Sequence, residues 1–160
     1  MGGPLSASWA RFEFRTDQGR IDARTWRDGA ALLLVLFAAL TAIWLFLEPN
    51  AHRELSAGSR LFDWKTFATF VYLLFYSFAV LFIGISFYNL SAKRLRARNL
   101  PSGLAGLVPL AALFAGAAHW LQPRVSEDLS FWYVAALDAA LAAAIVWTAV
   151  ELGFLQPREI

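Results

Sequence analysis

Residues 29–47, with the sequence GAALLLVLFAALTAIWLFL, contain no charged side chain and lie between Asp28 and Glu48. A helix needs roughly 20 mostly apolar residues to cross about 30 Å of bilayer hydrocarbon, where each backbone polar group must be paired within its own segment. This stretch has the required length and composition. It therefore predicts a membrane-spanning helix.

Three further stretches, residues 66–90, 104–121 and 129–155, have the same apolar character. The whole chain is 59% hydrophobic, which exceeds the apolar share of about 45–50% in soluble domains. We therefore predict an all-α integral membrane protein, in which residues 29–160 form a four-transmembrane-helix bundle. Pro109 falls in the first half of the third span, where we expect a kink because proline removes a helical hydrogen bond.

Lysine and arginine residues predict the orientation, because cytoplasmic loops of bacterial membrane proteins carry an excess of them. They gather before the first span and between the second and third, at Arg11, Arg15, Arg20, Arg24, Arg27, Lys93, Arg94, Arg96 and Arg98. The other two links are poorer in positive charge. We therefore expect a multi-pass protein of the bacterial inner membrane, with both termini in the cytoplasm.

Residues 1–28 are polar but interspersed with apolar side chains, namely Trp9, Phe12, Phe14, Ile21 and Trp26. This alternation is typical of a segment lying on lipid headgroups, so we predict a cytoplasmic N-terminal segment that is partly interfacial. A loosely ordered, solvated tail is the alternative. Asp22 is placed to cap a helix that continues through Trp26 into the first span.

Two basic motifs resemble the YhaH-like family of small bacterial inner-membrane proteins, a domain of unknown function. The matching residues are Gly19, Arg20, Arg24 and Trp26 in the first motif, and Lys93, Arg94, Leu95, Ser102 and Gly103 in the second. The chain departs from the family where Arg96 and Ala97 replace His-Asp, where Leu104 and Ala105 replace paired tryptophans, and where Gln156-Pro157-Arg158 replaces the C-terminal signature. The resemblance implies four spans with cytoplasmic basic loops, and it implies no activity.

Asp138 and Glu151 are ionisable residues inside the fourth span, where a charge costs several kcal/mol unless it is paired or hydrated. Asp138 is either a proton or ion relay or an acid that recognises a cationic group. The alternative is a buried carboxyl that is neutral or hydrogen-bonded to a neighbouring span through Thr41, Ser77 or a tyrosine. For Glu151 we expect a structural ion pair with Arg94, Arg96 or Arg98. The basic run formed by Lys93 and these three arginines is also placed to contact anionic lipid headgroups.

Small residues repeat at four-residue spacing along two spans, and such ridges allow helix backbones to approach closely. They are Ala136, Ala140 and Ala144 on the fourth span, and Gly103, Ala111, Ala115 and Ala118 on the third. Packing inside the bundle and docking onto another membrane subunit explain these ridges equally well.

Two features suggest an apolar cofactor. His119, with Ala115 one turn before it, is a candidate ligand for a pigment or haem. The aromatic residues of the second span are candidates for lining a quinone site. Lipid exposure and helix packing are the alternative explanations. There are no cysteines and only two histidines, and no constellation of residues identifies a reaction or a metal site, so we do not expect an enzyme.

These observations predict a non-catalytic accessory, assembly or scaffolding subunit of a larger membrane complex. A transporter or channel component that uses Asp138 in a homo-oligomer is the alternative, and a binder of quinone or pigment is another. The expected partners are the lipid bilayer and other membrane subunits or further copies of the chain. Nucleic acid is not expected, because the basic residues are distributed by membrane side rather than gathered into one patch.

Overall fold

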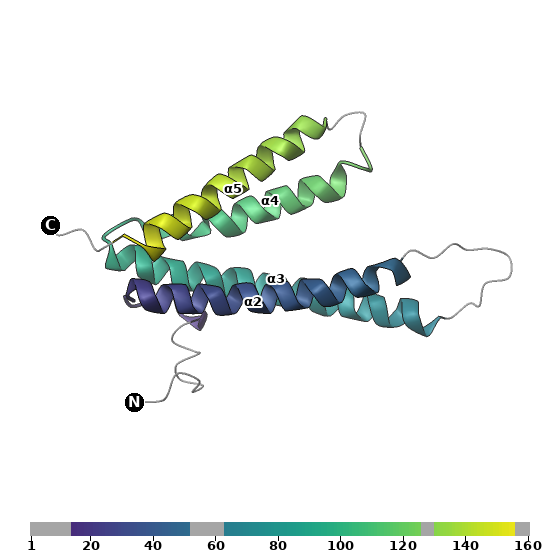
Figure 1. Cartoon of the computed structure of the whole chain (residues 1–160), viewed down its shortest axis with the longest axis horizontal. Coiled ribbons are helices and arrows are strands. Elements are labelled where there is room, and N and C mark those ends of the chain that lie inside the picture. Colours follow the sequence, from purple (N-terminus) through teal and green to yellow (C-terminus); the bar gives the residue numbers. More distant parts are fainter. Residues whose placement is uncertain (1–13, 52–62, 126–129, 156–160) are drawn as a thin grey trace. The chain divides into compact units, whose positions relative to one another are not determined.

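The structure, a computed structural model, describes residues 14–51, 63–125 and 130–155. Within these ranges the chain is helical and has no strand (Figure 1). The elements in chain order are α2 (Ala23–Leu47), η2 (Glu48–Asn50), α3 (Trp64–Ala97), η3 (Ser102–Gly106), α4 (Leu107–Leu121) and α5 (Phe131–Gly153). The all-α prediction is confirmed for the described residues.

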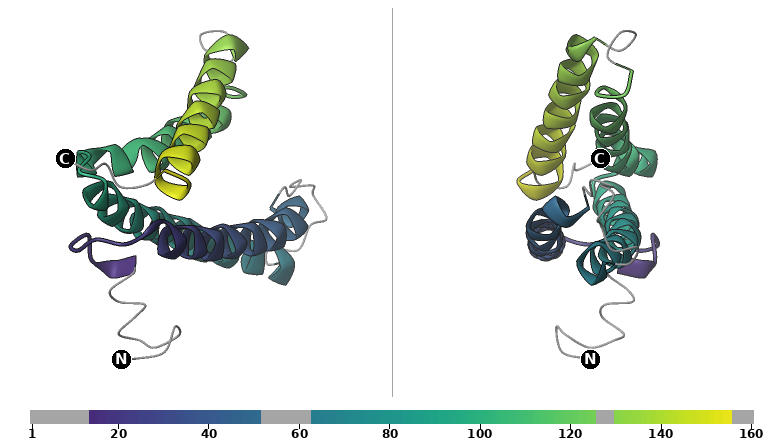
Figure 2. Two further views of the ribbon diagram at one scale, coloured as in Figure 1. Left: turned by 60° about the vertical axis from the view of Figure 1, so that its left-hand side comes forward. Right: turned by 90° about the vertical axis from the view of Figure 1, so that its right-hand side faces the viewer.

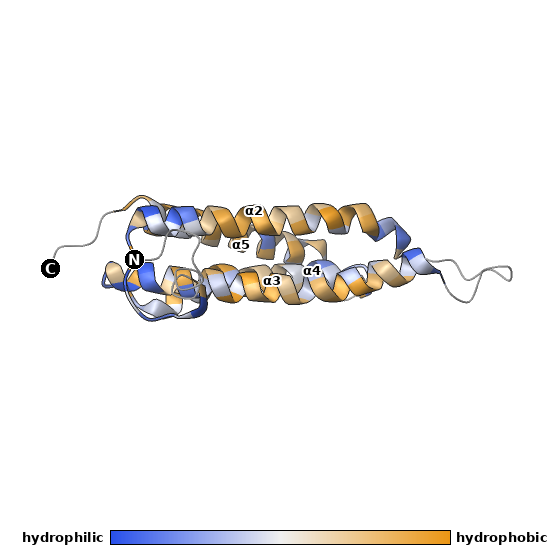
Figure 3. Ribbon diagram, turned by 90° about the horizontal axis from the view of Figure 1, so that it is seen from below, coloured by the Kyte–Doolittle hydropathy of each residue, from blue (hydrophilic) through white to orange (hydrophobic). Residues whose placement is uncertain are grey.

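Four helical segments are long and apolar enough to cross a membrane: Ala23–Asn50, Trp64–Ala97, Ser102–Leu121 and Phe131–Gly153. Figure 3 shows hydrophobic residues along the length of α2 and α3, with hydrophilic residues gathered at the helix ends. The four predicted stretches are therefore four helices. Their outer surfaces carry large apolar side chains such as Phe46 and Phe82, as expected of helices that contact lipid or other apolar surfaces.

The first two helices extend beyond the predicted spans because capping groups, rather than hydropathy, determine where they end. α2 begins at Ala23, six residues before the predicted span, and the predicted cap at Asp22 is confirmed, since its carboxylate accepts a 2.7 Å hydrogen bond from the Thr25 amide. α3 continues to Ala97 instead of residue 90. It ends where Asn99 adopts a left-handed conformation with φ of 56°, and the Leu100 amide bonds back to the Leu95 carbonyl.

The third predicted span divides into η3 and α4. The expected kink at Pro109 is wrong, because α4 itself begins at Leu107 and places the proline in its first turn. Backbone amides of a first turn have no intrahelical acceptor, so proline sacrifices no hydrogen bond there. The fourth span, α5, is slightly shorter than the predicted 129–155 and runs from Phe131 to Gly153.

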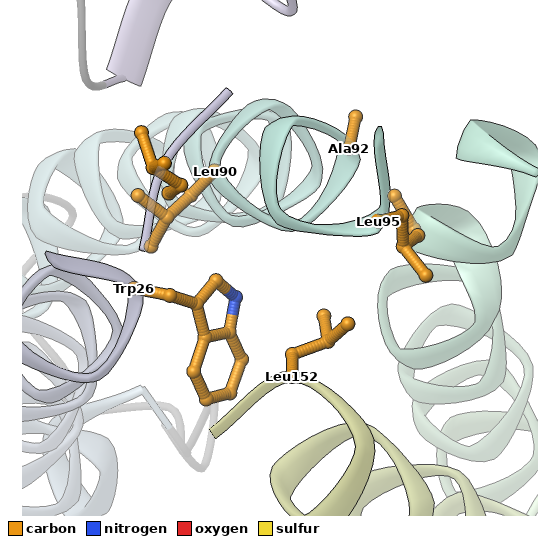
Figure 4. Close-up of a cluster of buried hydrophobic side chains, with 7 residues drawn as sticks. Trp26, Leu90, Ala92, Leu95 and Leu152 are labelled. Carbon is orange, nitrogen blue, oxygen red and sulfur yellow. The ribbon is translucent and has the colours of Figure 1, made fainter. Parts of the chain in front are cut away.

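The described residues form two compact units, which are considered separately. One unit contains residues 14–30 and 85–155, apart from 126–129, and the other contains residues 31–51 and 63–84. The first unit has a hydrophobic core in which Trp26 of α2 packs with Leu90 and Leu95 of α3 and with Leu152 of α5 (Figure 4). The indole Nε1 of Trp26 donates a 3.2 Å hydrogen bond to Ser91 Oγ. This core joins three helices at one end of each.

The described part of the N-terminal segment contacts protein. Ile21 is 8% exposed and Trp26 is 6% exposed, and both belong to this core. Asn89 also donates a 2.9 Å hydrogen bond to the Phe14 carbonyl. The expectation that Ile21 and Trp26 lie on lipid headgroups is therefore corrected, because their apolar surface is buried against α3 and α5. Residues 1–13, with the rest of the predicted interfacial segment, lie outside the described residues.

In the same unit, α4 and α5 run side by side as a hairpin (Figures 1 and 2). Ala115 and Ala118 of α4 and Val134 of α5 are buried. Small side chains on α4 allow the backbones to come close, so the α4 ridge predicted from its spacing lies partly inside this hairpin.

In the second unit, tyrosine hydroxyls of α3 bond to α2. Tyr72 donates a 2.7 Å hydrogen bond to the Leu40 carbonyl, and the Tyr76 hydroxyl lies 2.9 Å from Thr41 Oγ1. The rings of Tyr76 and Trp44 are stacked, with centroids 6.2 Å apart. Polar tips of aromatic side chains thus hold these parts of α2 and α3 together.

Candidate functional site

Arginine side chains cover the C-terminal end of α5. The last four carbonyls of a helix receive no hydrogen bond from an amide within the helix, and they carry its partial negative charge. Arg94 is 2% exposed, and its Nε donates to the Leu152 carbonyl at 3.0 Å while its Nη2 donates to the Leu155 carbonyl at 2.6 Å. One guanidinium therefore binds both the helix end and the residue just beyond it.

Two more arginines complete the arrangement. Arg98 Nη1 donates to the Glu151 carbonyl, and Arg27 Nη1 donates to the Gly153 carbonyl at 2.7 Å. The carbonyl of Val150 accepts from the Phe154 amide. All four terminal carbonyls of α5 are thus bonded, three of them by cations from α2, from α3 and from the turn that follows α3. We call Arg27, Arg94 and Arg98 the arginine cluster.

The basic run between residues 93 and 98 therefore differs from the exposed loop that the sequence suggests. Lys93, Arg94 and Arg98 are buried, and the run lies in the last turns of α3 and just beyond its end. Arg96 is half-buried and its Nη2 pairs with Asp17 at 2.8 Å. The expectation of lipid contact is corrected for the three buried residues, whose charged ends lie inside protein.

Glu151 forms the structural ion pair that the sequence predicts. Its Oε1 lies 2.9 Å from Arg98 Nη1, and both side chains are largely buried. The same arginine atom also binds the Glu151 backbone carbonyl. The acid thus neutralises one cation of the arginine cluster, which lowers the cost of burying it.

Asp138 meets His119 across the α4–α5 hairpin. The imidazole Nε2 lies 3.1 Å and 3.0 Å from the two carboxylate oxygens. The expected partners Thr41 and Ser77 belong to the second unit, where the Thr41 hydroxyl bonds to Tyr76 and the Ser77 hydroxyl donates to the Leu73 carbonyl. His119 lies two residues before the end of α4 and Asp138 lies seven residues after the start of α5, so equal distance from the link does not predict this contact.

The His119–Asp138 pair is open on one side. The two side chains are 59% and 47% exposed, respectively. Asp138 follows the start of α5 by two turns, which places it about 10 Å along the helix at about 1.5 Å per residue. Large exposed apolar side chains, including Leu113, Phe114 and Ile145, occupy the same two helices. A polar pair is therefore presented by a hairpin that is otherwise apolar.

The alanine ridge of α5 is defined by Ala136, Ala140 and Ala144. Ala136 and Ala140 are exposed, and Ala144 is half-buried. This differs from Ala115 and Ala118 of α4, which are buried in the hairpin. Most of the α5 ridge therefore remains available on the surface of the described chain.

The aromatic residues of α3 contribute to a groove of about 580 Å³ in the second unit. Its lining is almost wholly apolar and consists of Leu47, Trp64, Phe67, Ala68, Val71, Tyr72 and Phe75. The Tyr72 hydroxyl already donates to the Leu40 carbonyl. A quinone site combines an apolar pocket with polar groups that orient the quinone carbonyls. In this groove the Tyr72 hydroxyl donates its hydrogen bond to α2, so it is not directed at a ligand.

Among the described residues, no group of three histidine, cysteine, aspartate or glutamate side chains is placed to hold a metal ion. His119 directs Nε2 at Asp138, so a pigment or haem at that nitrogen would have to displace the carboxylate. Comparisons with protein-family models, curated proteins and solved structures found no match. The resemblance to the YhaH-like family stays a prediction, and no residue role is transferred from a relative.

Proposed function

We propose that the four long helices cross the bacterial inner membrane, with both ends of the chain in the cytoplasm. The support is their length and apolarity. Arg27, near the start of α2, bonds to Gly153 at the end of α5, so the beginning and end of the helical region meet, as an even number of crossings requires. The arginine cluster lies at this end, as cytoplasmic positive charge does. Membership of the YhaH-like family is part of the same proposal.

We further propose that the protein is a non-catalytic accessory subunit of a larger membrane complex. The observation that carries this function is the half-exposed His119–Asp138 pair. An unpaired aspartate at the centre of a membrane helix costs about 2.5–3.5 kcal/mol on insertion scales, which is an upper bound for Asp138 because it lies two turns from the start of α5 and contacts His119. A polar surface of a partner subunit that covers the pair would remove much of this cost.

The alanine ridge gives a partner subunit a second surface, suited to close approach. Ala136 and Ala140 are exposed, and helices associate in membranes through small residues that bring backbones together. Residues two positions apart on a helix point about 200° apart, so the ridge and Asp138 occupy different faces of α5. The helix thus offers a packing face and a separate polar face.

A second candidate function is proton or cation transport by a homo-oligomer. The 3.0 Å separation of His119 and Asp138 favours it, because an imidazole and a carboxylate in contact can exchange a proton. In this function Asp138 is essential for flux, whereas in the accessory function it stabilises an interface.

Membrane insertion is tested first, by washing membranes with alkaline carbonate. The protein should remain in the pellet, and release into the supernatant would contradict insertion. Gentle detergent extraction, native electrophoresis and mass spectrometry then test association. We expect the wild-type chain to migrate with a larger complex that contains other subunits.

Two variants separate the candidate functions. Ala140→Leu should release the chain from the complex, while the control Ala112→Leu, at an exposed alanine of α4, should leave it bound. Asp138→Asn should weaken association without affecting any ion flux. A homo-oligomer in liposomes whose flux disappears in Asp138→Asn would instead support transport, and a monomer without flux would contradict both functions.

A further inference from the structure

A basic groove lies beside the arginine cluster in the first unit. Its volume is about 540 Å³, and it is lined by Arg20, Ile21, Asp22, Ala23, Arg24, Arg27, Arg94, Ala97, Phe154 and Leu155. Four of these residues are arginines and one is an acid. The groove is therefore a concave surface with excess positive charge, a combination that attracts anions.

Two of the arginines are held in position by the fold. Arg94 donates to the carbonyls of Leu152 and Leu155, and Arg27 donates to the carbonyl of Gly153. These bonds fix the two guanidinium groups before any ligand arrives, so binding orders fewer side chains. Arg94 and Arg27 together use three N–H groups in these bonds, whereas two guanidinium groups carry ten.

The other two arginines lie on the exposed rim. Arg20 has no ion-pair partner within the described part of the chain, and Arg24 lies 3.9 Å from Asp28 in an exposed pair. Such surface pairs are weak and exchange readily. The single acid of the groove, Asp22, directs Oδ1 at the Thr25 amide, 2.7 Å away. The carboxylate that opposes an anion is thus partly neutralised by the start of α2.

The groove also has an apolar side. Phe154 is 72% exposed, Leu155 is 42% exposed, and the Arg27 guanidinium lies 5.9 Å from the centre of the Phe154 ring. An ionic ligand without a hydrocarbon part would leave these side chains uncovered. A ligand with a negatively charged head and an apolar chain would satisfy both sides of the groove.

We propose that this groove binds an anionic phospholipid, with the phosphate on Arg20, Arg24 and Arg27 and an acyl chain against Phe154 and Leu155. The proposal rests on the proposed membrane insertion. Basic pockets between helices at the cytoplasmic surface suit anionic headgroups, because guanidinium groups bind phosphate oxygens in pairs. The site lies apart from the alanine ridge, so lipid binding requires no partner subunit.

Native mass spectrometry of the purified chain in detergent tests the proposal. The probes are phosphatidylglycerol, phosphatidylcholine with the same chains, and glycerol 3-phosphate as a soluble phosphate. The variant is Arg20→Gln with Arg24→Gln, and the charge-matched control is Arg15→Gln with Arg124→Gln, which lie outside the groove. Circular dichroism confirms that each variant is folded. If the double variant is unfolded, Arg24→Gln alone is used in its place.

The wild-type chain should retain phosphatidylglycerol in preference to phosphatidylcholine. Each basic residue near a membrane surface is worth about fivefold in binding, so the double variant should bind phosphatidylglycerol about thirtyfold more weakly and Arg24→Gln about fivefold. The control should bind like wild type. Equal retention of both lipids, equal loss in the control, or displacement of lipid by millimolar glycerol 3-phosphate would overturn the proposal. Failure of the accessory function would instead appear as a chain that binds lipid normally but migrates alone.

Discussion

Replacing Arg94 with methionine should destabilise the first unit strongly. Methionine keeps much of the apolar volume but removes the hydrogen bonds to the carbonyls of Leu152 and Leu155. A hydrogen bond to a charged group contributes about 1.5–3 kcal/mol. Loss of two such bonds therefore lowers the free energy of unfolding by about 3–6 kcal/mol. Leu155 is partly exposed, and its carbonyl can bond to water instead. We therefore expect a loss of about 3 kcal/mol in the free energy of unfolding.

Unfolding in mixed micelles, titrated with sodium dodecyl sulfate and followed by tryptophan fluorescence, measures this loss. Trp26 packs in the same core as Leu152 and reports on it. Arg94→Lys should recover about half of the loss, because one ammonium cannot reproduce the forked geometry of a guanidinium.

The matched control is Arg96→Met, on the same helix. Arg96 is half-buried and pairs with the exposed Asp17, and such surface pairs are worth about 0–1 kcal/mol. The reasoning is refuted if Arg94→Met and Arg96→Met unfold within 0.5 kcal/mol of one another, since the end of α5 would then need no cation.

Other substitutions test individual contacts by the same titration. Gly29→Leu should cost about 1–3 kcal/mol, because even a Cβ there would lie 3.0 Å from Leu90 Cδ2, while Gly84→Ala, with open space around it, should cost nothing. Tyr72→Phe removes the hydrogen bond to the Leu40 carbonyl and should lower the free energy of unfolding by about 1 kcal/mol. An unchanged unfolding midpoint would show that this hydrogen bond does not contribute to stability. Hydrogen bonds from Thr25 hold the pKa of Asp22 below its ordinary value of 3.8. The stability contributed by this carboxylate is therefore present above pH 3.8 and lost as the pH falls through the lowered pKa, and Asp22→Ala should cost about 1 kcal/mol at pH 7 but less at pH 3.

Hydropathy predicted the four helices because it is a local property of each stretch. The helix ends were less accessible, since they depend on single capping groups such as Asp22 and the left-handed Asn99. Asp22 was recognised from its residue type, which is enriched at helix starts. The end of α3 within the basic run was missed, because charged residues there indicate the end of a hydrocarbon span rather than the end of a helix.

The contacts of the candidate site are long-range, and this limits what the sequence predicts. Arg94 and Leu152 are 58 residues apart, and Arg27 and Gly153 are 126 apart. A positive charge near a predicted membrane boundary is already expected from the excess of arginine and lysine in cytoplasmic loops. The sequence around Arg94 therefore does not show that its side chain is buried against the end of another helix. The partner of Asp138 is not predicted for a different reason. Hydrogen-bonding capacity alone points to hydroxyl side chains, whereas the packing of α4 against α5 brings the His119 imidazole to the carboxylate.

The central claim is that α5 docks onto another membrane subunit, and photo-crosslinking from Ala140 tests it most directly. A benzophenone amino acid at position 140 should give, in intact cells, one discrete adduct heavier than the 17.8 kDa chain and containing a different protein. The same probe at the exposed position 112 of α4 should not give this adduct. The claim is contradicted if the chain carrying the probe at position 140 remains at its monomer mass after irradiation, because the alanine ridge would then face lipid alone.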